Sequence, residues 1–245
     1  MIKFGIVITT YMRPDGTTPK YLTRCLESVK NQTHKNYKVY VIGDKYENNS
    51  EFTDICNRII DKDKIFFENL PFAKERDKYI PNNLEALWSY GGWYASNYGI
   101  DVALNDGIEY ICRLDHDDFW GPNHLSNFNE AITKFNAQFV CSLSSYLHHR
   151  VLPAIKPTTD KFVKYIPAPM GCIKSSTCLN QKTIPLRSRN LMEETGSVGL
   201  PGDADLWGRI NKHIINNNIP SYVVNEKTCF HDEEGSTRII FNKKR

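Results

Sequence analysis

The chain has 245 residues, of which 40% are hydrophobic and 24% are charged, a composition typical of soluble globular proteins. Its 31 basic and 28 acidic residues leave a net charge of +3, so the chain lacks the global field that marks a nucleic-acid-binding protein. The length allows one sizeable core and favours a single large domain or two small ones, and one α/β domain is enough to account for it.

The amino-terminal apolar run is brief, too short for a signal-peptide core or a membrane span. The seven cysteines are scattered without the C-x-x-C spacing of metal sites, which agrees with buried thiols in a reducing compartment. We therefore expect a cytoplasmic protein without a transmembrane segment.

The first part of the chain alternates strand and helix patterns. The β-branched stretch from Lys3 to Thr10 predicts a strand, which is followed by a turn-rich loop from Tyr11 to Pro19. The next elements are a helix with Leu22, Cys25, Leu26 and Val29 on one face, a strand from Tyr37 to Ile42 that stops at Gly43-Asp44, a helix with Phe52, Ile55, Cys56, Ile59 and Ile60 on one face, and a strand from Lys64 to Phe67. This order predicts a parallel sheet with right-handed crossovers.

Nucleotide-binding folds of this order usually carry glycine-rich phosphate loops. The chain has no G-x-G-x-x-G after its first strand and no G-x-x-x-x-G-K-[ST] anywhere, which disfavours dinucleotide-binding and P-loop folds. Any phosphates must be held in another way, for which a divalent metal is the obvious candidate.

Two further segments lead to the most informative stretch of the chain. Leu70 to Tyr90 is a polar and aromatic insertion with two prolines, which we expect to be a functional or mobile loop. Gly91-Gly92 then precedes a helix candidate that packs through Trp93, Ile100, Ala103 and Leu104.

Three carboxylates follow the apolar start of the stretch Y-I-C-R-L-D-H-D-D-F-W-G-P, from Tyr110 to Pro122. They are Asp115, Asp117 and Asp118, and they repel one another unless a positive charge lies among them. A hard divalent cation would supply that charge. The cluster is placed between a strand and a helix, where open α/β sheets bind ligands. A solvated turn is the alternative, because aspartate also ends strands and caps helices.

The second half of the chain has weaker patterns. We expect strands at Phe139–Leu147, Ile166–Ile173 and Ile219–Val224, an irregular segment at Val151–Tyr165, and a polar loop at Lys174–Val198. A helix with Leu206, Ile210 and Ile214 begins near Asp203 and Asp205, where the positive end of its dipole stabilises carboxylates. No repeat or linker divides the chain.

Together these motifs resemble family 2 of the inverting, nucleotide-sugar-dependent glycosyltransferases, which have the GT-A fold. The resemblance runs along nearly the whole chain in the right order, and its motifs are V-I-T-T-Y-M-R-P, C-L-E-S-V-K-N-Q-T-H-K-N-Y-K-V-Y-V-I-G-D, A-S-N-Y-G-I, L-D-H-D-D and G-D-A-D-L-W-G-R. Ser96 stands where the family usually has arginine, and Gly202 where it usually has glutamate.

The resemblance implies a role for individual residues. Asp44 would contact the nucleobase or ribose, in a pocket that Thr10, Tyr11 and Arg13 line and to which Asn97 adds a donor-side contact. Asp115 and Asp117 would hold the metal and the donor diphosphate, with Asp118 in support. Asp203 would be the catalytic base, His231 a further metal ligand, and Ser236 to Arg238 part of a loop that closes over the diphosphate.

The expected fold is then a GT-A-like α/β domain over residues 1–245, with a mostly parallel central sheet flanked by helices. Residues 1–122 would form the Rossmann-like half that binds the nucleotide sugar, and residues 123–245 the half that binds the acceptor. The expected activity is Mn²⁺- or Mg²⁺-dependent transfer of a sugar from a nucleotide diphosphate, UDP by family frequency, to a hydroxyl of a glycan, protein or lipid-linked acceptor.

Each assignment has a structural alternative. Asp203 could be a helix cap, Asp44 a turn residue and His231 a structural histidine, while Trp120 and Trp207 could line an acceptor pocket or pack in the core. Other functions also remain open: a non-catalytic nucleotide- or glycan-binding domain, a nucleotidyltransferase, or a metal-dependent hydrolase. The last two lack their usual residues, a glycine- and lysine-rich first loop and additional histidines respectively.

Overall fold

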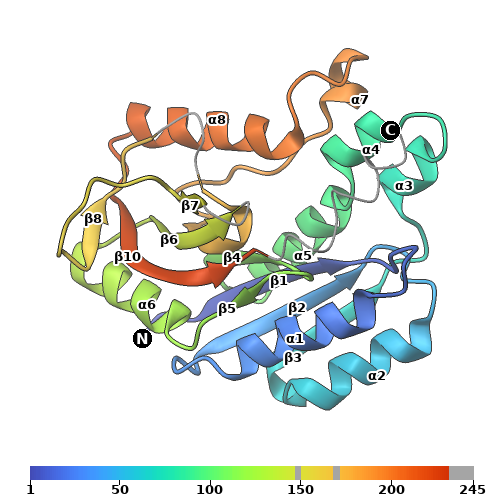
Figure 1. The fold of residues 1–245 in the computed structure, drawn as a ribbon, viewed down its shortest axis with the longest axis horizontal. Coiled ribbons are helices and arrows are strands. Elements are labelled where there is room, and N and C mark those ends of the chain that lie inside the picture. Colours follow the sequence, from blue (N-terminus) through green and yellow to red (C-terminus); the bar gives the residue numbers. More distant parts are fainter. Residues whose placement is uncertain (147–149, 168–171, 232–245) are drawn as a thin grey trace.

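A mixed β-sheet with helices on both faces forms the body of the molecule (Figure 1). The computed structural model describes residues 1–146, 150–167 and 172–231. Within these residues ten strands make one sheet, in which eight follow the order β3-β2-β1-β4-β9-β6-β10-β5 while β7 pairs with β6 and β8 with β10.

The strands are β1 (Phe4–Thr10), β2 (Tyr37–Gly43), β3 (Ile65–Asn69), β4 (Tyr110–Asp115), β5 (Phe119–Trp120), β6 (Phe139–Tyr146), β7 (Arg150–Leu152), β8 (Phe162–Lys164), β9 (Thr177–Asn180) and β10 (Ser221–Phe230). The α-helices are α1 (Thr18–Lys30), α2 (Asn49–Ile59), α3 (Lys74–Tyr79), α4 (Leu84–Tyr90), α5 (Trp93–Asn105), α6 (His124–Phe135), α7 (Leu191–Thr195) and α8 (Gly202–Asn216). Two 3₁₀ turns, η1 (Lys62–Lys64) and η2 (Lys174–Ser176), complete the described elements.

The first half of the chain contributes a parallel unit in which β1 lies between β2 and β4. Phe4 is opposite Tyr37 on one side and Tyr110 on the other. Successive side chains of β1 point to opposite faces, so Ile6 and Ile8 pack with α1, α2 and α6, whereas Val7 packs with α5. Both faces of these strands are buried, which is why they are apolar almost throughout.

The second half of the chain extends the same sheet. β9 runs antiparallel to both β4 and β6, and β10 runs parallel to β6. Helix α8 covers one face of this part through Leu206 and Ile210, which cluster with Phe139 of β6 (Figure 1). The sheet is therefore continuous across both halves, and the expected α/β architecture with a mostly parallel central sheet is confirmed.

Helix α5 lies unusually close to the sheet at Gly99. A Cβ atom at this position would be 2.7 Å from Cγ1 of Val7 and 2.9 Å from Cγ1 of Ile42. The glycine in the A-S-N-Y-G-I segment therefore allows the middle of α5 to pack closely against β1 and β2.

Two sequence-based expectations were wrong in the connecting segments. Leu70 to Tyr90 is not one long loop, because it contains α3 and α4. The Lys174–Val198 segment, also expected to be a loop, contains η2, β9 and α7.

The strand expected at Ile166–Ile173 is absent from its described residues, and the pairing strand is β9 instead. Ile166 is 77% exposed, and Pro167 has no N–H to give to a neighbouring strand. All four residues of β9 are buried between β4 and β6. No helix in the described part of the chain is long and apolar enough to cross a membrane.

Candidate active site

The carboxyl ends of β1, β2 and β4 meet at one edge of the sheet. Thr10 is the last residue of β1, Asp44 directly follows β2, and Asp115 is the last residue of β4. The backbone N–H of Asp44 donates to the carbonyl oxygen of Thr10 at 2.7 Å, which ties the first two ends together. Parallel strands therefore place the predicted donor-side residues next to one another.

Asp44 and Thr10 each carry a buried oxygen that nothing in the described chain satisfies. Both residues are 1% exposed, and Oδ1 of Asp44 and Oγ1 of Thr10 have no hydrogen-bond partner among the described residues. Burial raises the pKa of Asp44, and the guanidinium of Arg76 opposes this shift from 3.2 Å. Unsatisfied buried oxygens are costly, so they mark a place where a polar ligand completes the structure.

Arg76 is a residue of this site that the sequence did not reveal. It lies on α3, bonds to the carboxylate of Asp44 and to backbone oxygens of Asp44 and Lys45, and its guanidinium is 5.0 Å from the ring centre of Tyr11. Arg76 belongs to no recognisable sequence motif, and it lies in a segment that we expected to be a loop. Helix α3 has only six residues, too few for a helical period that could have marked it.

The three aspartates at the end of β4 and in the turn that follows it each face a different cation. Asp115 is 2.7 Å from Nζ of Lys174, and Asp117 is 3.6 Å from the buried guanidinium of Arg13. Asp118 is fully buried, and its Oδ1 lies 2.8 Å from Nδ1 of His231. Burial alone would lower the pKa of His231, but the hydrogen bond to Asp118 raises it to about 9.

The structure thus brings Arg13 and His231 to the acidic cluster, where they pair with aspartates. The described side chains of the cluster do not surround a metal position. Among the described residues no group of three or more histidine, cysteine, aspartate or glutamate side chains is placed to hold a metal ion. Asp115 and Asp117 still offer carboxylate oxygens, the ligand type that hard divalent cations prefer. Of these two carboxylates, that of Asp115 is the more open, with 32% of its side chain exposed.

Asp203 lies exposed in the first turn of α8. Its charge and that of Asp115 act on the same two cations, Arg113 and Lys174. Burial lowers the pKa of Arg113 to about 10, while Asp203 and Asp115 act against that shift. Burial also disfavours the charged form of Lys174, yet Asp115 and Asp203 raise its pKa. Arg113 and Lys174 therefore link the acidic cluster to the predicted base, and neither was singled out from the sequence, although an arginine inside an apolar strand is a signal.

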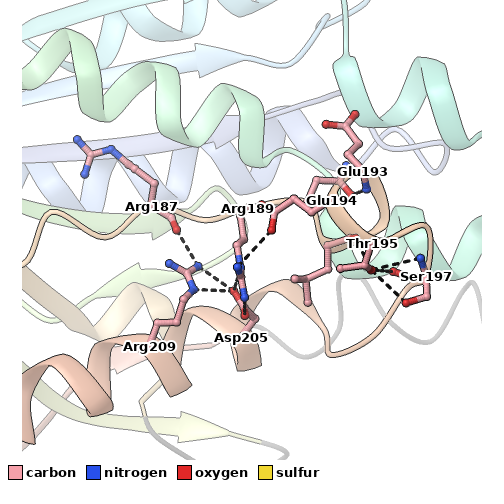
Figure 2. A network of polar contacts seen from close by, with 10 residues as sticks. Arg187, Arg189, Glu193, Glu194, Thr195, Ser197, Asp205 and Arg209 are labelled. Carbon is pink, nitrogen blue, oxygen red and sulfur yellow. Dashed lines mark hydrogen bonds and ion pairs between the residues drawn. The ribbon is translucent and has the colours of Figure 1, made fainter.

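The neighbouring Asp205 has a structural role. Arg189 donates two hydrogen bonds to its carboxylate, at 3.0 and 2.7 Å, and Arg209 donates one at 2.8 Å (Figure 2). Burial alone would raise the pKa of Asp205, but these bonds lower it. Asp205 and Arg209 form an ion pair four residues apart on α8, and Asp205 is held ionised by two arginines rather than poised to accept a proton.

Gly202 is required by the position of α4. A Cβ atom at Gly202 would be 2.7 Å from the carbonyl oxygen of Ser89 and 3.4 Å from the ring of Tyr90. The end of α4 thus occupies the space into which a larger residue before Asp203 would project. This contact explains why glycine stands where the family pattern has glutamate.

Other predicted residues lie nearby or outside the described structure. Asn97 of α5 donates to the carbonyl oxygen of Ser188 at 3.0 Å. Trp120 and Trp207 are buried in the core, at 3% and 6% exposed, which favours packing over an acceptor surface. Arg238 and the loop around it lie outside the described residues.

Comparisons with known proteins show the family of the chain. Residues 5–71 match the family model described as glycosyl transferase family 2. The uncharacterized glycosyltransferase R139 of Acanthamoeba polyphaga mimivirus is 41% identical to this chain over 249 residues. The match covers 97% of this chain and 96% of the mimivirus protein. The succinoglycan biosynthesis protein ExoW of Rhizobium meliloti (strain 1021) is 31% identical over 137 residues, 56% of this chain and 36% of that protein.

Solved structures show the same fold. The crystal structure of S. aureus TarS 1-349 in complex with UDP-GlcNAc has a TM-score of 0.66 and 12% identity, and the match covers 98% of this chain and 61% of that one. The chain thus spans about three fifths of the length of this solved structure. The fold is that of the GT-A glycosyltransferases. With its near-complete match to the mimivirus protein, the chain belongs to glycosyltransferase family 2 and is a glycosyltransferase.

Proposed function

We propose that this glycosyltransferase moves a sugar from a UDP-sugar to an acceptor hydroxyl with inversion and with the help of a divalent metal. One observation carries the proposal: the ends of β1, β2 and β4 bring the unsatisfied buried oxygens of Thr10 and Asp44 next to an acidic cluster. A nucleoside fits the first feature and a diphosphate with a cation fits the second.

The nucleoside would bind at Thr10, Tyr11, Asp44 and Arg76. Its hydroxyl and N–H groups can donate to the free oxygens of Asp44 and Thr10, while Tyr11 and Arg76 offer a flat surface on which a base can stack. The solved TarS structures with UDP and with UDP-GlcNAc support a uridine nucleotide for this chain.

Asp115 and Asp117 would hold Mn²⁺ or Mg²⁺. When bound, the cation stabilises negative charge on the leaving diphosphate as a Lewis acid. Lys174 and Arg13, which pair with these carboxylates, are positioned to add positive charge on the same side. His231 would act through Asp118, whose carboxylate it orients.

Asp203 would take the proton from the acceptor hydroxyl. It is exposed, whereas Asp205 two residues later is buried and bonded to two arginines. Asp203 and Asp115 both act on the charges of Arg113 and Lys174, so a base on Asp203 would lie near a leaving group held at Asp115, as one displacement at the anomeric carbon with inversion requires.

The test is thermal unfolding with UDP, GDP, dTDP and CMP, each with manganese and with EDTA, followed by an assay for UDP release from UDP-sugars. A ligand at ~100 times its dissociation constant that binds only the native state adds roughly 2.7 kcal/mol, a clear shift of the midpoint. We expect a manganese-dependent shift with UDP. No shift with any nucleotide would refute the donor assignment, and binding without UDP release would favour a non-catalytic binding domain.

A further inference from the structure

A cavity of about 270 Å³ lies between α3, α5 and the segment 188–194. We call it the α3–α5 pocket. Glu75 of α3, Trp93 and Asn97 of α5, and Arg189 and Glu193 of the covering segment are among its lining residues. None of these elements belongs to the acidic cluster, and the proposed function leaves the pocket without an occupant.

Three side chains that line this pocket each have a buried polar atom with no hydrogen-bond partner in the described part of the chain. These atoms are Oε2 of Glu75, Oδ1 of Asn97 and Nε1 of Trp93. Glu75 is only 2% exposed, so its carboxylate is removed from bulk water. Three such atoms around one cavity are costly to leave unsatisfied, and they indicate a ligand that supplies their partners.

The cations at the pocket are already engaged. Lys74 lies 3.4 Å from Glu193, to which Lys78 also donates at 2.9 Å. Arg189 is bonded to Asp205 and Glu194 (Figure 2). Glu75 has no ion pair within the residues that the structure describes, so the charge that remains for a ligand is negative.

The surroundings of Glu75 make negative charge unfavourable at this place, including the charge of its own carboxylate. Burial raises its pKa to about 7, and the carboxylate of Asp44 adds to the shift. An anionic ligand group would add to this unfavourable field, whereas a hydroxyl can donate a hydrogen bond to the carboxylate.

The pocket adjoins both parts of the proposed active site. Glu75 precedes Arg76, which bonds to Asp44, and the charge of Asp44 acts on Glu75. On the other side of the pocket, the carbonyl oxygen of Ser188 accepts a hydrogen bond from Asn97 at 3.0 Å. The hydroxyl of Ser188 accepts one from Arg113 at 3.3 Å. A group in the pocket would therefore lie near the nucleotide contacts and the Arg113 side of the site at once.

We propose that the α3–α5 pocket holds the ring of an uncharged sugar and that Glu75 selects it against anionic sugars. Ring hydroxyls donate to Glu75 and Asn97, and a ring or substituent oxygen accepts from Trp93. The terminal torsion of glutamate is soft, so the free oxygen of Glu75 can turn toward the ligand without a change of backbone, while Asn97 keeps its hydrogen bond to Ser188. The inference rests on the proposed donor-binding role of the neighbouring residues.

Calorimetric titration in manganese of the wild-type chain and of Glu75→Gln tests this assignment. The ligands are UDP, UDP-glucose, UDP-galactose, UDP-GlcNAc and UDP-glucuronate, and methyl glucoside and methyl glucuronide are tested separately by saturation-transfer NMR. Glu85→Gln, on the exposed face of α4, is the matched control. Unfolding midpoints establish that both variants are folded.

We expect Glu75→Gln to leave UDP affinity within about twofold and to reduce by about tenfold the gain in affinity that the preferred neutral sugar adds to UDP. The preference for UDP-glucose over UDP-glucuronate should shrink in the same variant. That result assigns the pocket to the donor sugar. Weaker binding of methyl glucoside with an unchanged donor series assigns it to the acceptor sugar instead.

Two outcomes overturn the inference. If Glu75→Gln weakens UDP as much as the UDP-sugars, Glu75 belongs to the nucleotide site. If neither the UDP-sugars nor the methyl glycosides respond to the substitution, the pocket holds no sugar. Failure of the wild-type chain to bind UDP would refute the proposed function separately, and the methyl glycosides would still test the pocket.

Discussion

At the scale of single residues, the acidic turn after β4 is stabilised by one cation for each carboxylate. Lys174, Arg13 and His231 face Asp115, Asp117 and Asp118 respectively. Breaking a buried pair costs more than the pair contributes, because it leaves a buried charge without compensation. Substitutions of Asp118 or Arg13 therefore affect folding as well as binding, and they are poor probes of catalysis.

Asp203 is a better probe because it is exposed. We expect Asp203→Asn to retain the UDP affinity and unfolding midpoint of the wild-type chain, and to lose turnover by about 10²- to 10⁴-fold, the usual contribution of a general base. UDP release from the preferred UDP-sugar measures this loss. Asp54→Asn, at an exposed position of α2, is the control. Normal turnover in Asp203→Asn would place the base elsewhere.

Glu75 makes stability depend on pH. Its pKa is about 7 in the folded chain against an ordinary value of 4.5, so the folded state binds more protons than the unfolded state between these values. Its neighbours Asp44 and Lys74 act on it in opposite directions, Asp44 raising and Lys74 lowering the pKa. The contribution of Glu75 to stability therefore falls as pH rises from about 4.5 to 7 and stays low above that range.

Replacing Glu75 with glutamine removes the titrating group and with it this dependence of stability on pH. We expect Glu75→Gln to match the wild-type free energy of unfolding near pH 4 and to exceed it by ~3 kcal/mol at pH 8, at about 1.4 kcal/mol per unit of pKa difference. Urea unfolding at several pH values measures this, with Glu85→Gln as the reference. A constant difference across the range would contradict the linkage.

At the scale of elements, the close approach of α5 to the sheet depends on the absence of a side chain at Gly99. We expect Gly99→Ala to destabilise the chain by about 1–3 kcal/mol, because the added methyl group would overlap Val7 and Ile42. Gly208→Ala on α8 meets no atom within 4 Å and should instead stabilise by up to ~1 kcal/mol through helix propensity. Urea unfolding of the two variants measures both effects, and equal effects would mean that packing at Gly99 is not tight.

The elements that the sequence predicted well share strong patterns. The strands around Ile6 and Val39 and the helix around Leu22 to Val29 have long apolar periods, and each lies within a few residues of its expected place. The six-residue α3 and the four-residue β9 are too short to show a period. They form because tertiary neighbours bury them, which residue propensity cannot reveal.

At the scale of the whole molecule, the two halves share one sheet. β4 from the first half pairs with β9 from the second, and β5 pairs with β10. Trp120, which ends β5, belongs to the same apolar cluster as Cys229 of β10. The halves at 1–122 and 123–245 therefore describe expected roles within one folded unit.

This continuity predicts that neither half folds alone. We expect the fragments 1–122 and 123–245, expressed separately, to show no cooperative unfolding, because each would expose a sheet edge and part of the shared core. Co-expressed fragments should reassemble and regain manganese-dependent UDP binding. A sharp urea transition in the isolated 1–122 fragment would show that the donor half is an independent domain.

The sequence by itself determined the α/β class, the order of the main elements and the positions of Asp44, Asp115 and Asp203, because local periodicity and short motifs are properties of neighbouring residues. The tertiary structure alone decided that Arg76 meets Asp44 and that Gly202 makes room for α4. It also created the α3–α5 pocket from three separate segments. Contacts between residues far apart in the chain depend on how elements pack, and no local pattern records them.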